Sequence, residues 1–202
     1  MTGHERRAAA TKEAIKDTML DLLKKTPFND ISISLLCREA GVGRATFYTH
    51  YNGLTEVIDE LADDAIDATK RSKAPGLSGV SILLEKMRST MDPKVLAPYM
   101  DLLPVCQRVA DQPKYRPLFF DEFLSDYMMM RIFRRERELM TPYFMENSSL
   151  TAMQAEKVFL FGIAGAYAVN HSMNWKKDAD WYEVQKALLT FLDGGYGALK
   201  KL

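Results

Sequence analysis

The chain contains 202 residues, of which 47% are hydrophobic and 27% are charged, and its 27 basic residues balance its 27 acidic ones. These proportions are typical of globular proteins and exclude a chain that is disordered throughout. The charge is unevenly distributed, because residues 1–52 hold eight basic and six acidic side chains. The positive excess is small, but its sign favours a polyanionic partner for the N-terminal end.

The sequence shows no sign of secretion or of membrane insertion. Cys37 and Cys106 each lie inside an apolar helical pattern, which predicts two buried thiols in a reducing compartment rather than a disulfide. The N-terminal segment has no apolar signal core, and no uninterrupted apolar run approaches the ~20 residues that a membrane-spanning helix needs. We therefore expect a cytoplasmic protein with no membrane partner.

Apolar residues recur with helical spacing along the chain, and strand-like alternation is not found, so we expect an all-α protein. We place the start of the first helix at Thr11 and its end at Pro27. Ser32 can cap a second helix, and Gly41 ends it at a position that usually needs a left-handed backbone. A third, short helix is expected over residues 44–50.

Only about four residues separate the second and third helices, which suits the steep crossing of a helix-turn-helix. Beyond them Pro104 predicts a broken helix. The remaining expected elements are a fourth helix over about 54–70, a loop over 72–80, and helices over about 80–91, 94–110, 115–145, 150–175 and 180–200.

The segment GVGRATFYTHY, residues 41–51, combines rings, hydroxyl groups and one arginine. In a helix-turn-helix the second helix enters the major groove of DNA, so it needs an inward apolar side and an outward polar side. The spacing of Val42, Phe47 and Tyr51 lets them turn inward. Outward-facing side chains can then contact base edges or phosphates, with Arg44 suited to a guanine. The candidate DNA-binding residues are Ser32, Ser34, Arg44, Ala45, Thr46, Tyr48, Thr49 and His50. The alternative is a helical hairpin whose rings only fill a core.

The run ISISLLCREAGVGRATFYTHYNGLTEVIDEL resembles the DNA-binding domain of TetR/AcrR-type transcriptional regulators. That family shares the Ala-Gly-Val turn and a recognition helix with a small residue, an aromatic residue, Tyr and His. The resemblance implies an all-helical homodimer that binds a palindromic DNA operator, usually as a repressor. Residues 1–53 would form the helix-turn-helix DNA-binding domain, and residues 54–202 a helical domain for effector binding and dimerisation.

Two positions depart from the family pattern. Gly43 stands where a Ser is common, and Leu54 stands where the fourth helix commonly begins with a Lys. Both departures remove a contact to phosphate, and the salt dependence of DNA binding scales with the number of phosphates neutralised. We therefore expect a shallower salt dependence than is usual for this family.

The last two expected helices carry wide apolar faces. The run FLFGIAGAYAVNHSMNW contains small residues that allow close helix approach, and an apolar stripe continues from Trp181. Two adjacent antiparallel helices of this kind suit a four-helix dimer interface, although a core pair within one chain is the alternative. This end also resembles a subgroup of TetR regulators common in low-GC Gram-positive bacteria. The candidate dimer residues are Gly162, Gly165, Ala166, Val184, Leu188 and Leu192.

The run PLFFDEFLSDYMMMRIF is rich in aromatic residues and methionines, which can line an adaptable apolar cavity or pack as ordinary core. The candidates for contact with an unidentified small-molecule effector are Phe119, Phe123, Tyr127, Met130 and His171. A lone histidine in an apolar helix can equally be a hydrogen-bonded core residue. The arginines and glutamates of 131–138 form either an ion-paired face or a site for an anionic effector.

The sequence offers little for catalysis. The three histidines are far apart and have no partners at metal-ligand spacing, and the glycine-rich run 193–197 lacks the Gly-Lys-Ser/Thr of a phosphate-binding loop. We expect no catalytic residues, no metal and no cofactor. Two hypotheses remain: a ligand-modulated, operator-binding regulator, and a regulator-like protein that acts through a protein partner.

Overall fold

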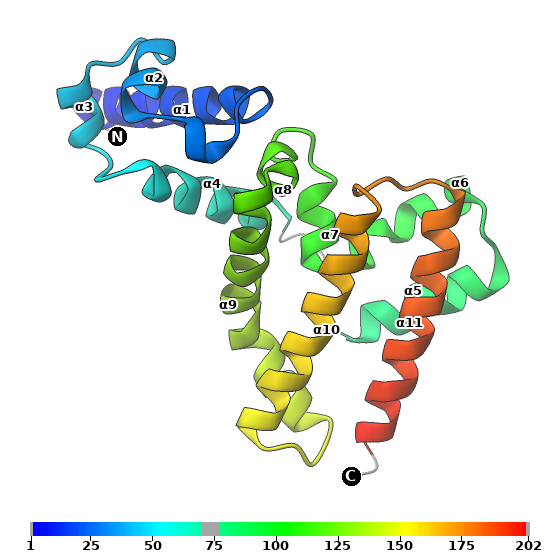
Figure 1. The fold of residues 1–202 in the computed structure, drawn as a ribbon. Helices are drawn as coiled ribbons and strands as arrows, with labels where there is room; N and C mark the ends of the chain where they lie inside the picture. Colours follow the sequence, from blue (N-terminus) through cyan, green and yellow to red (C-terminus); the bar gives the residue numbers. More distant parts are fainter. Residues whose placement is uncertain (1, 70–76, 201–202) are drawn as a thin grey trace. The chain divides into compact units, whose positions relative to one another are not determined.

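The computed structural model describes residues 2–69 and 77–200, and every regular element in these ranges is a helix (Figure 1). The expected all-α class is confirmed. The described residues group into two compact units. The first combines the chain up to Asp67 with Gln112–Met128, and the second combines Ala68–Asp111 with the chain from Met129 onward. The expected functional boundary between residues 53 and 54 stays a prediction.

The first unit is built around a small core between α1 and α4. Ile15 and Met19 of α1, Leu36 of α2, Phe47 of α3 and Ile58 of α4 are all fully buried. The elements of this unit are α1 (Gly3–Leu23), η1 (Phe28–Asp30), α2 (Ile33–Glu39), α3 (Arg44–Tyr48), α4 (Leu54–Ala68), α8 (Pro117–Phe120) and the first turns of α9 (Glu122–Glu146).

The first helix begins earlier than the sequence suggested. The prediction of a start at Thr11 is wrong, because Thr2 and Glu5 form a capping box that begins α1 at Gly3. The Thr2 backbone N–H donates to the Glu5 carboxylate at 2.7 Å, and the Thr2 hydroxyl accepts from the Glu5 N–H at 3.2 Å. Thr11 lies inside the helix, where its hydroxyl donates to the carbonyl of Arg7.

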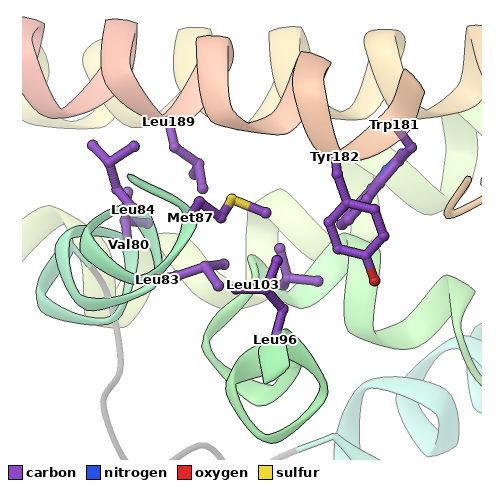
Figure 2. Close-up of a cluster of buried hydrophobic side chains, with 9 residues drawn as sticks. All are labelled: Val80, Leu83, Leu84, Met87, Leu96, Leu103, Trp181, Tyr182 and Leu189. Atoms are coloured by element: carbon purple, nitrogen blue, oxygen red, sulfur yellow. The ribbon is translucent and has the colours of Figure 1, made fainter. Parts of the chain in front are cut away.

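The second unit contains the longer helices. α5 packs along α11, and its Val80, Leu83, Leu84 and Met87 meet Trp181, Tyr182 and Leu189 of α11 in one buried cluster (Figure 2). Its elements are α5 (Leu77–Ser89), α6 (Pro93–Leu96), η2 (Ala97–Leu102), α7 (Val105–Ala110), the remainder of α9, α10 (Ala152–Ser172) and α11 (Ala179–Leu199).

A chain of buried amides connects α7, α10 and α11. The indole N–H of Trp181 donates to Asn170 at 2.8 Å, and the side-chain amide of Gln185 donates to the same Asn170 oxygen at 3.3 Å. Gln107 in turn donates to Gln185 at 3.0 Å. Because these groups are buried, the hydrogen bonds fix how the three helices pack against one another.

Several expected boundaries in this part of the chain are corrected. The loop expected over 72–80 is helical from Leu77 onward, and residues 70–76 lie outside the described residues. The break expected at Pro104 is confirmed, since Pro104 precedes α7. The continuous helix expected over 115–145 is wrong, because it is divided at Asp121 into α8 and α9, whereas Pro142 stays inside α9.

Two further sequence expectations can be compared with the described residues. Cys37 and Cys106 are both buried and free, as predicted. Within residues 2–69 and 77–200, no helix combines the length and the hydropathy that a membrane span requires.

Candidate nucleic-acid interface

The helices α2 and α3 are joined by four residues in a tight, hydrogen-bonded turn. Ser32 caps α2, as predicted, by accepting a hydrogen bond from the Leu35 N–H at 3.1 Å. Gly41 has a φ of 64°, so it occupies the left-handed region that favours glycine. The Val42 N–H then donates to the carbonyl of Cys37 at 2.9 Å. The segment therefore forms the helix-turn-helix that its sequence predicted.

Aromatic rings hold α3 against the core of the first unit. Phe47 is completely buried, and Tyr51 is 3% exposed with its ring centroid 5.8 Å from that of Phe47. The Tyr51 hydroxyl donates to the Glu60 carboxylate at 3.0 Å. Burial and this carboxylate together raise the pKa of Tyr51. Val42, expected to face inward with them, is only half-buried.

Ion pairs between α1 and α4 support the same unit. The ammonium group of Lys12 lies 2.6 Å from Glu60, and that of Lys16 lies between Glu13, Glu60 and Asp64. Burial alone would lower the pKa of Lys16, but hydrogen bonds to Asp64 and Glu13 outweigh it and raise the pKa. These lysines therefore serve the packing of α1 on α4 rather than an external polyanion.

The side of α3 opposite Phe47 is open to solvent. Tyr48 is 49% exposed, and Arg44 forms no ion pair with any residue in the described ranges. Of the eight candidate DNA-binding residues, seven are exposed and His50 is half-buried; the exposed ones are Ser32, Ser34, Arg44, Ala45, Thr46, Tyr48 and Thr49.

The hydroxyl groups of this surface differ in what they can offer to a phosphate. The Ser32 hydroxyl accepts from the Leu35 N–H, so its own proton is available to donate. The Thr49 hydroxyl instead donates to the carbonyl of Thr46 at 2.6 Å. A phosphate oxygen can only accept a hydrogen bond, so Thr49 suits a phosphate contact less well than Ser32 does.

Much of the positive charge at this end of the chain is neutralised within the unit. Besides Lys12 and Lys16, Lys24 pairs with Asp21 at 2.6 Å and Arg38 pairs with Glu39 at 3.0 Å. Four of the eight basic residues of 1–52 are therefore engaged in ion pairs. These four side chains are therefore less available to an external polyanion than the sequence alone suggests.

The two positions that depart from the family pattern lie at the starts of α3 and α4. Gly43 is the N-cap residue of α3, and no side chain caps that helix. Leu54 is the first residue of α4 and is half-buried. A β-carbon at Gly43 would meet only the Thr46 hydroxyl, at 3.8 Å, so the local fold has room for the serine that is common in that family.

Asp121 is an important residue that the sequence reasoning missed. Its carboxylate is 9% exposed and accepts hydrogen bonds from the N–H groups of Phe123 and Leu124, at 3.1 and 3.0 Å. The other oxygen accepts from the Phe28 N–H at 2.7 Å. The rings of Phe28 and Phe123 also stack, 5.8 Å apart. Asp121 thus attaches η1, beside the helix-turn-helix, to the start of α9.

The five candidate effector residues are divided between the two units. Phe119 is buried, Phe123 is 55% exposed and Tyr127 donates to Asp59, all within the first unit. Met130 and His171 belong to the second unit, where Met130 is half-buried and His171 is exposed beside the ring of Tyr167. Their role in ligand binding stays an untested prediction.

The second unit contains a cavity of about 130 Å³ that these five residues do not line. Two of its walls come from α10 and α11, which the sequence analysis assigned to a dimer interface. The lining residues are Val80, Leu102, Leu103, Pro104, Val105, Arg108, Glu136, Leu139, Met140, Phe144, Phe159, Gly162, Ile163, Ala166, Leu192 and Tyr196.

The candidate dimer residues divide into two groups. Gly162, Ala166 and Leu192 line this cavity, and the first two are buried. Gly165 is exposed, and Val184 and Leu188 are half-buried. Gly162 packs on Tyr196 of the same chain, whereas Gly165 is exposed, and the role of these residues in a dimer stays a prediction.

Comparison with known proteins gives one partial sequence match. No family model matches the chain. A stretch of 58 residues is 36% identical to an uncharacterized HTH-type transcriptional regulator, YxbF, of Bacillus subtilis (strain 168). The match covers 28% of this chain and only 15% of the relative. Among solved structures, the dihydroxyacetone kinase operon activator DhaS aligns with a TM-score of 0.41 and 12% identity, over 94% of this chain and 97% of that one.

Proposed function

We propose that this chain is a DNA-binding transcriptional regulator of the TetR type, which binds a palindromic operator as a homodimer and responds to a small ligand. One observation carries the proposal: α3 is fixed to the core by Phe47 and presents to solvent Ala45, Thr46 and an Arg44 that forms no ion pair within the described residues. An exposed helix of this kind, rigidly supported from behind, suits insertion into the major groove.

The exposed residues of α3 divide by chemistry into two roles. Arg44 can donate two hydrogen bonds to the O6 and N7 atoms of a guanine, and Ala45 or Thr46 can contact a thymine methyl group. Tyr48 can donate to a phosphate, as can Ser32 at the start of α2. Base contacts would specify the operator sequence, and the phosphate contacts would set the position of the helix on the duplex.

An exposed apolar surface on α10 and α11 supports the homodimer. Phe161 is 67% exposed and Phe191 is 65% exposed, and the neighbouring Gly165 is open to solvent. Residues 158–170 of α10 carry no charged side chain. Exposed apolar side chains in a region without charge are typical of protein interfaces, and a twofold dimer would place one α3 on each half of a palindrome.

The partial match to YxbF supports the coarser part of the proposal, since that protein is described as an HTH-type transcriptional regulator. The TetR family, the repressor role, the dimer and the ligand rest on the sequence resemblance and on the surfaces described above. The cytoplasmic location is proposed on the same basis, because a transcriptional regulator must reach the genome.

The double substitution Arg44→Ala with Tyr48→Phe tests the proposal. We expect it to weaken binding to the preferred operator by at least tenfold, because it removes one base contact of about 1–3 kcal/mol and one phosphate contact from each subunit. Fluorescence anisotropy with a labelled duplex measures the affinity. Lys94→Ala removes a positive charge from an exposed site on α6 and should leave the affinity unchanged.

The same pair of variants separates the proposal from its alternative. If the chain acts through a protein partner, the double variant should retain its regulatory activity in cells and should change DNA binding little. The lack of a Lys at Leu54 and of a Ser at Gly43 favours this alternative, because both reduce the number of phosphate contacts.

A further inference from the structure

The cavity of the second unit is apolar and small. Thirteen of its sixteen lining residues are aliphatic, aromatic or thioether side chains or proline. Its volume of about 130 Å³ is close to that of an engineered protein cavity of about 150 Å³ that binds benzene. A single six-membered ring is therefore the size of molecule that this space can enclose.

Gly162 and Tyr196 shape one wall of the cavity. A β-carbon at position 162 would overlap the hydroxyl oxygen of Tyr196 and would lie 3.9 Å from a methyl group of Leu192. The ring of Tyr196 is also held by Phe144, with centroids 5.0 Å apart. The missing side chain of Gly162 is thus what allows the Tyr196 hydroxyl to lie against α10 at the edge of the cavity.

The Tyr196 hydroxyl is a polar group without a hydrogen-bond partner among the described residues. Burial raises the pKa of Tyr196 to about 12, so the group stays protonated at neutral pH and can both donate and accept. The Tyr196 side chain is only partly buried, so its hydroxyl is accessible, and a molecule in the cavity can hydrogen-bond to it.

The charged groups of the cavity balance each other. The Arg108 guanidinium donates to the carbonyls of Leu103, at 2.9 Å, and of Thr69. Burial lowers the pKa of Arg108, and the negative charge of Glu136 opposes this effect. With one positive and one negative group in the same wall, the cavity has no net charge with which to attract an ion.

We propose that this cavity binds an uncharged, single-ring apolar molecule that carries one hydroxyl group, and that the Tyr196 hydroxyl hydrogen-bonds to it beside Gly162. The assignment of this molecule as the effector rests on the proposed function, whereas its binding to the cavity does not. The cavity lies between the α10–α11 pair and the α5–α7 region, so a ligand there contacts the helices proposed to dimerise.

Isothermal titration calorimetry with p-cresol and toluene tests the proposal on the full-length chain. Both probes fit the cavity, but only p-cresol can hydrogen-bond to Tyr196. We expect both to bind the wild type. Tyr196→Phe should weaken the binding of p-cresol by about five- to tenfold, which is the factor for one neutral hydrogen bond. It should not weaken the binding of toluene. A merely structural role of Tyr196 would affect both probes alike.

Gly162→Ala tests the location of the site. The added methyl group should displace the Tyr196 ring into the cavity and reduce the affinity for both probes by more than tenfold. Gly194→Ala is the matched control, because a β-carbon at that exposed glycine of α11 meets nothing within 4 Å. Circular dichroism and thermal unfolding check that each variant is folded. If Gly162→Ala does not fold, the Tyr196→Phe variant still tests the proposal.

Three results would overturn the proposal: no binding of either probe to the wild type, unchanged affinity in folded Gly162→Ala, or equal weakening of both probes by Tyr196→Phe. These measurements contain no DNA. Loss of probe binding with intact DNA recognition therefore contradicts the cavity assignment alone, and probe binding without DNA recognition contradicts the proposed function alone.

Discussion

Asp121 shows how one carboxylate can hold distant parts of the chain together. It lies 93 positions after Phe28 in sequence, yet it accepts the Phe28 N–H while it also caps the first turn of α9. Because the carboxylate is almost fully buried, the N–H groups it satisfies would have few alternative partners without it.

Asp121→Ala should therefore destabilise the first unit. We expect a loss of about 2–4 kcal/mol in the free energy of unfolding, since a helix cap contributes ~1 kcal/mol and a buried N–H left without a partner costs about 1–3 kcal/mol. Urea denaturation followed by circular dichroism measures the change. Asp126→Ala, at an exposed position of the same helix, is the control, and equal effects of the two substitutions would contradict the role assigned to Asp121.

At the residue scale the sequence predicted local contacts better than distant ones. The cap at Ser32 and the left-handed Gly41 follow from residues next to them, so they could be predicted from pattern alone. The bond between Asp121 and Phe28 could not, because no local signal connects two positions so far apart. The Thr2–Glu5 capping box was available as a local signal in the sequence and was overlooked.

At the scale of elements, the start of α4 is the position where the proposed DNA binding can be tested by adding a charge. Leu54 is half-buried at the first position of α4, next to the exposed Thr55 and Glu56. A lysine can cover the same apolar surface with its aliphatic stem while its ammonium group reaches solvent. The position therefore accepts a charge without loss of packing.

Leu54→Lys should steepen the salt dependence of DNA binding. We expect the slope of log K against log salt to increase in magnitude by about 0.9 for each subunit, the value for one additional phosphate contact. Leu54→Met, which adds no charge, should leave the slope as it is. If the lysine variant also keeps the wild-type slope, position 54 does not face DNA.

The sequence predicts which segments are helical better than it predicts where each helix begins and ends. α8 and α9 form one continuous apolar pattern in the sequence, and only the buried Asp121 divides them. Pro142 lies inside the helix expected over 115–145, and α9 does continue through it to Glu146. At Asp121, hydrogen bonds to its carboxylate override the local sequence signal.

At the scale of the whole molecule, the exposed apolar side chains of α10 and α11 form the surface that we propose to bind a second subunit. Phe161 and Phe191 are each about two-thirds exposed. The sequence pointed to these two helices correctly as an apolar pair, but it could not show that Gly162 and Ala166 are used inside the chain, because the ring that fills the space beside Gly162 comes from another helix.

Phe161→Glu should convert the proposed dimer into a monomer. A buried, unpaired carboxylate in each subunit of an apolar interface costs several kcal/mol, which at micromolar protein concentration is enough to favour dissociation. Sedimentation velocity measures the mass. Val95→Glu introduces the same charge at an exposed position of α6 and should not change it. A wild-type monomer, or a dimer that persists in Phe161→Glu, would contradict this interface.

The central claim, that the chain reads DNA sequence through α3, is tested most directly by selecting bound duplexes from a random pool with the wild type and with the Arg44→Ala, Tyr48→Phe variant. The account predicts that the wild type enriches an inverted repeat whose half-sites lie about 34–36 Å apart or a multiple of that distance, and that the variant does not. Wild-type protein that enriches no sequence over the starting pool would contradict it.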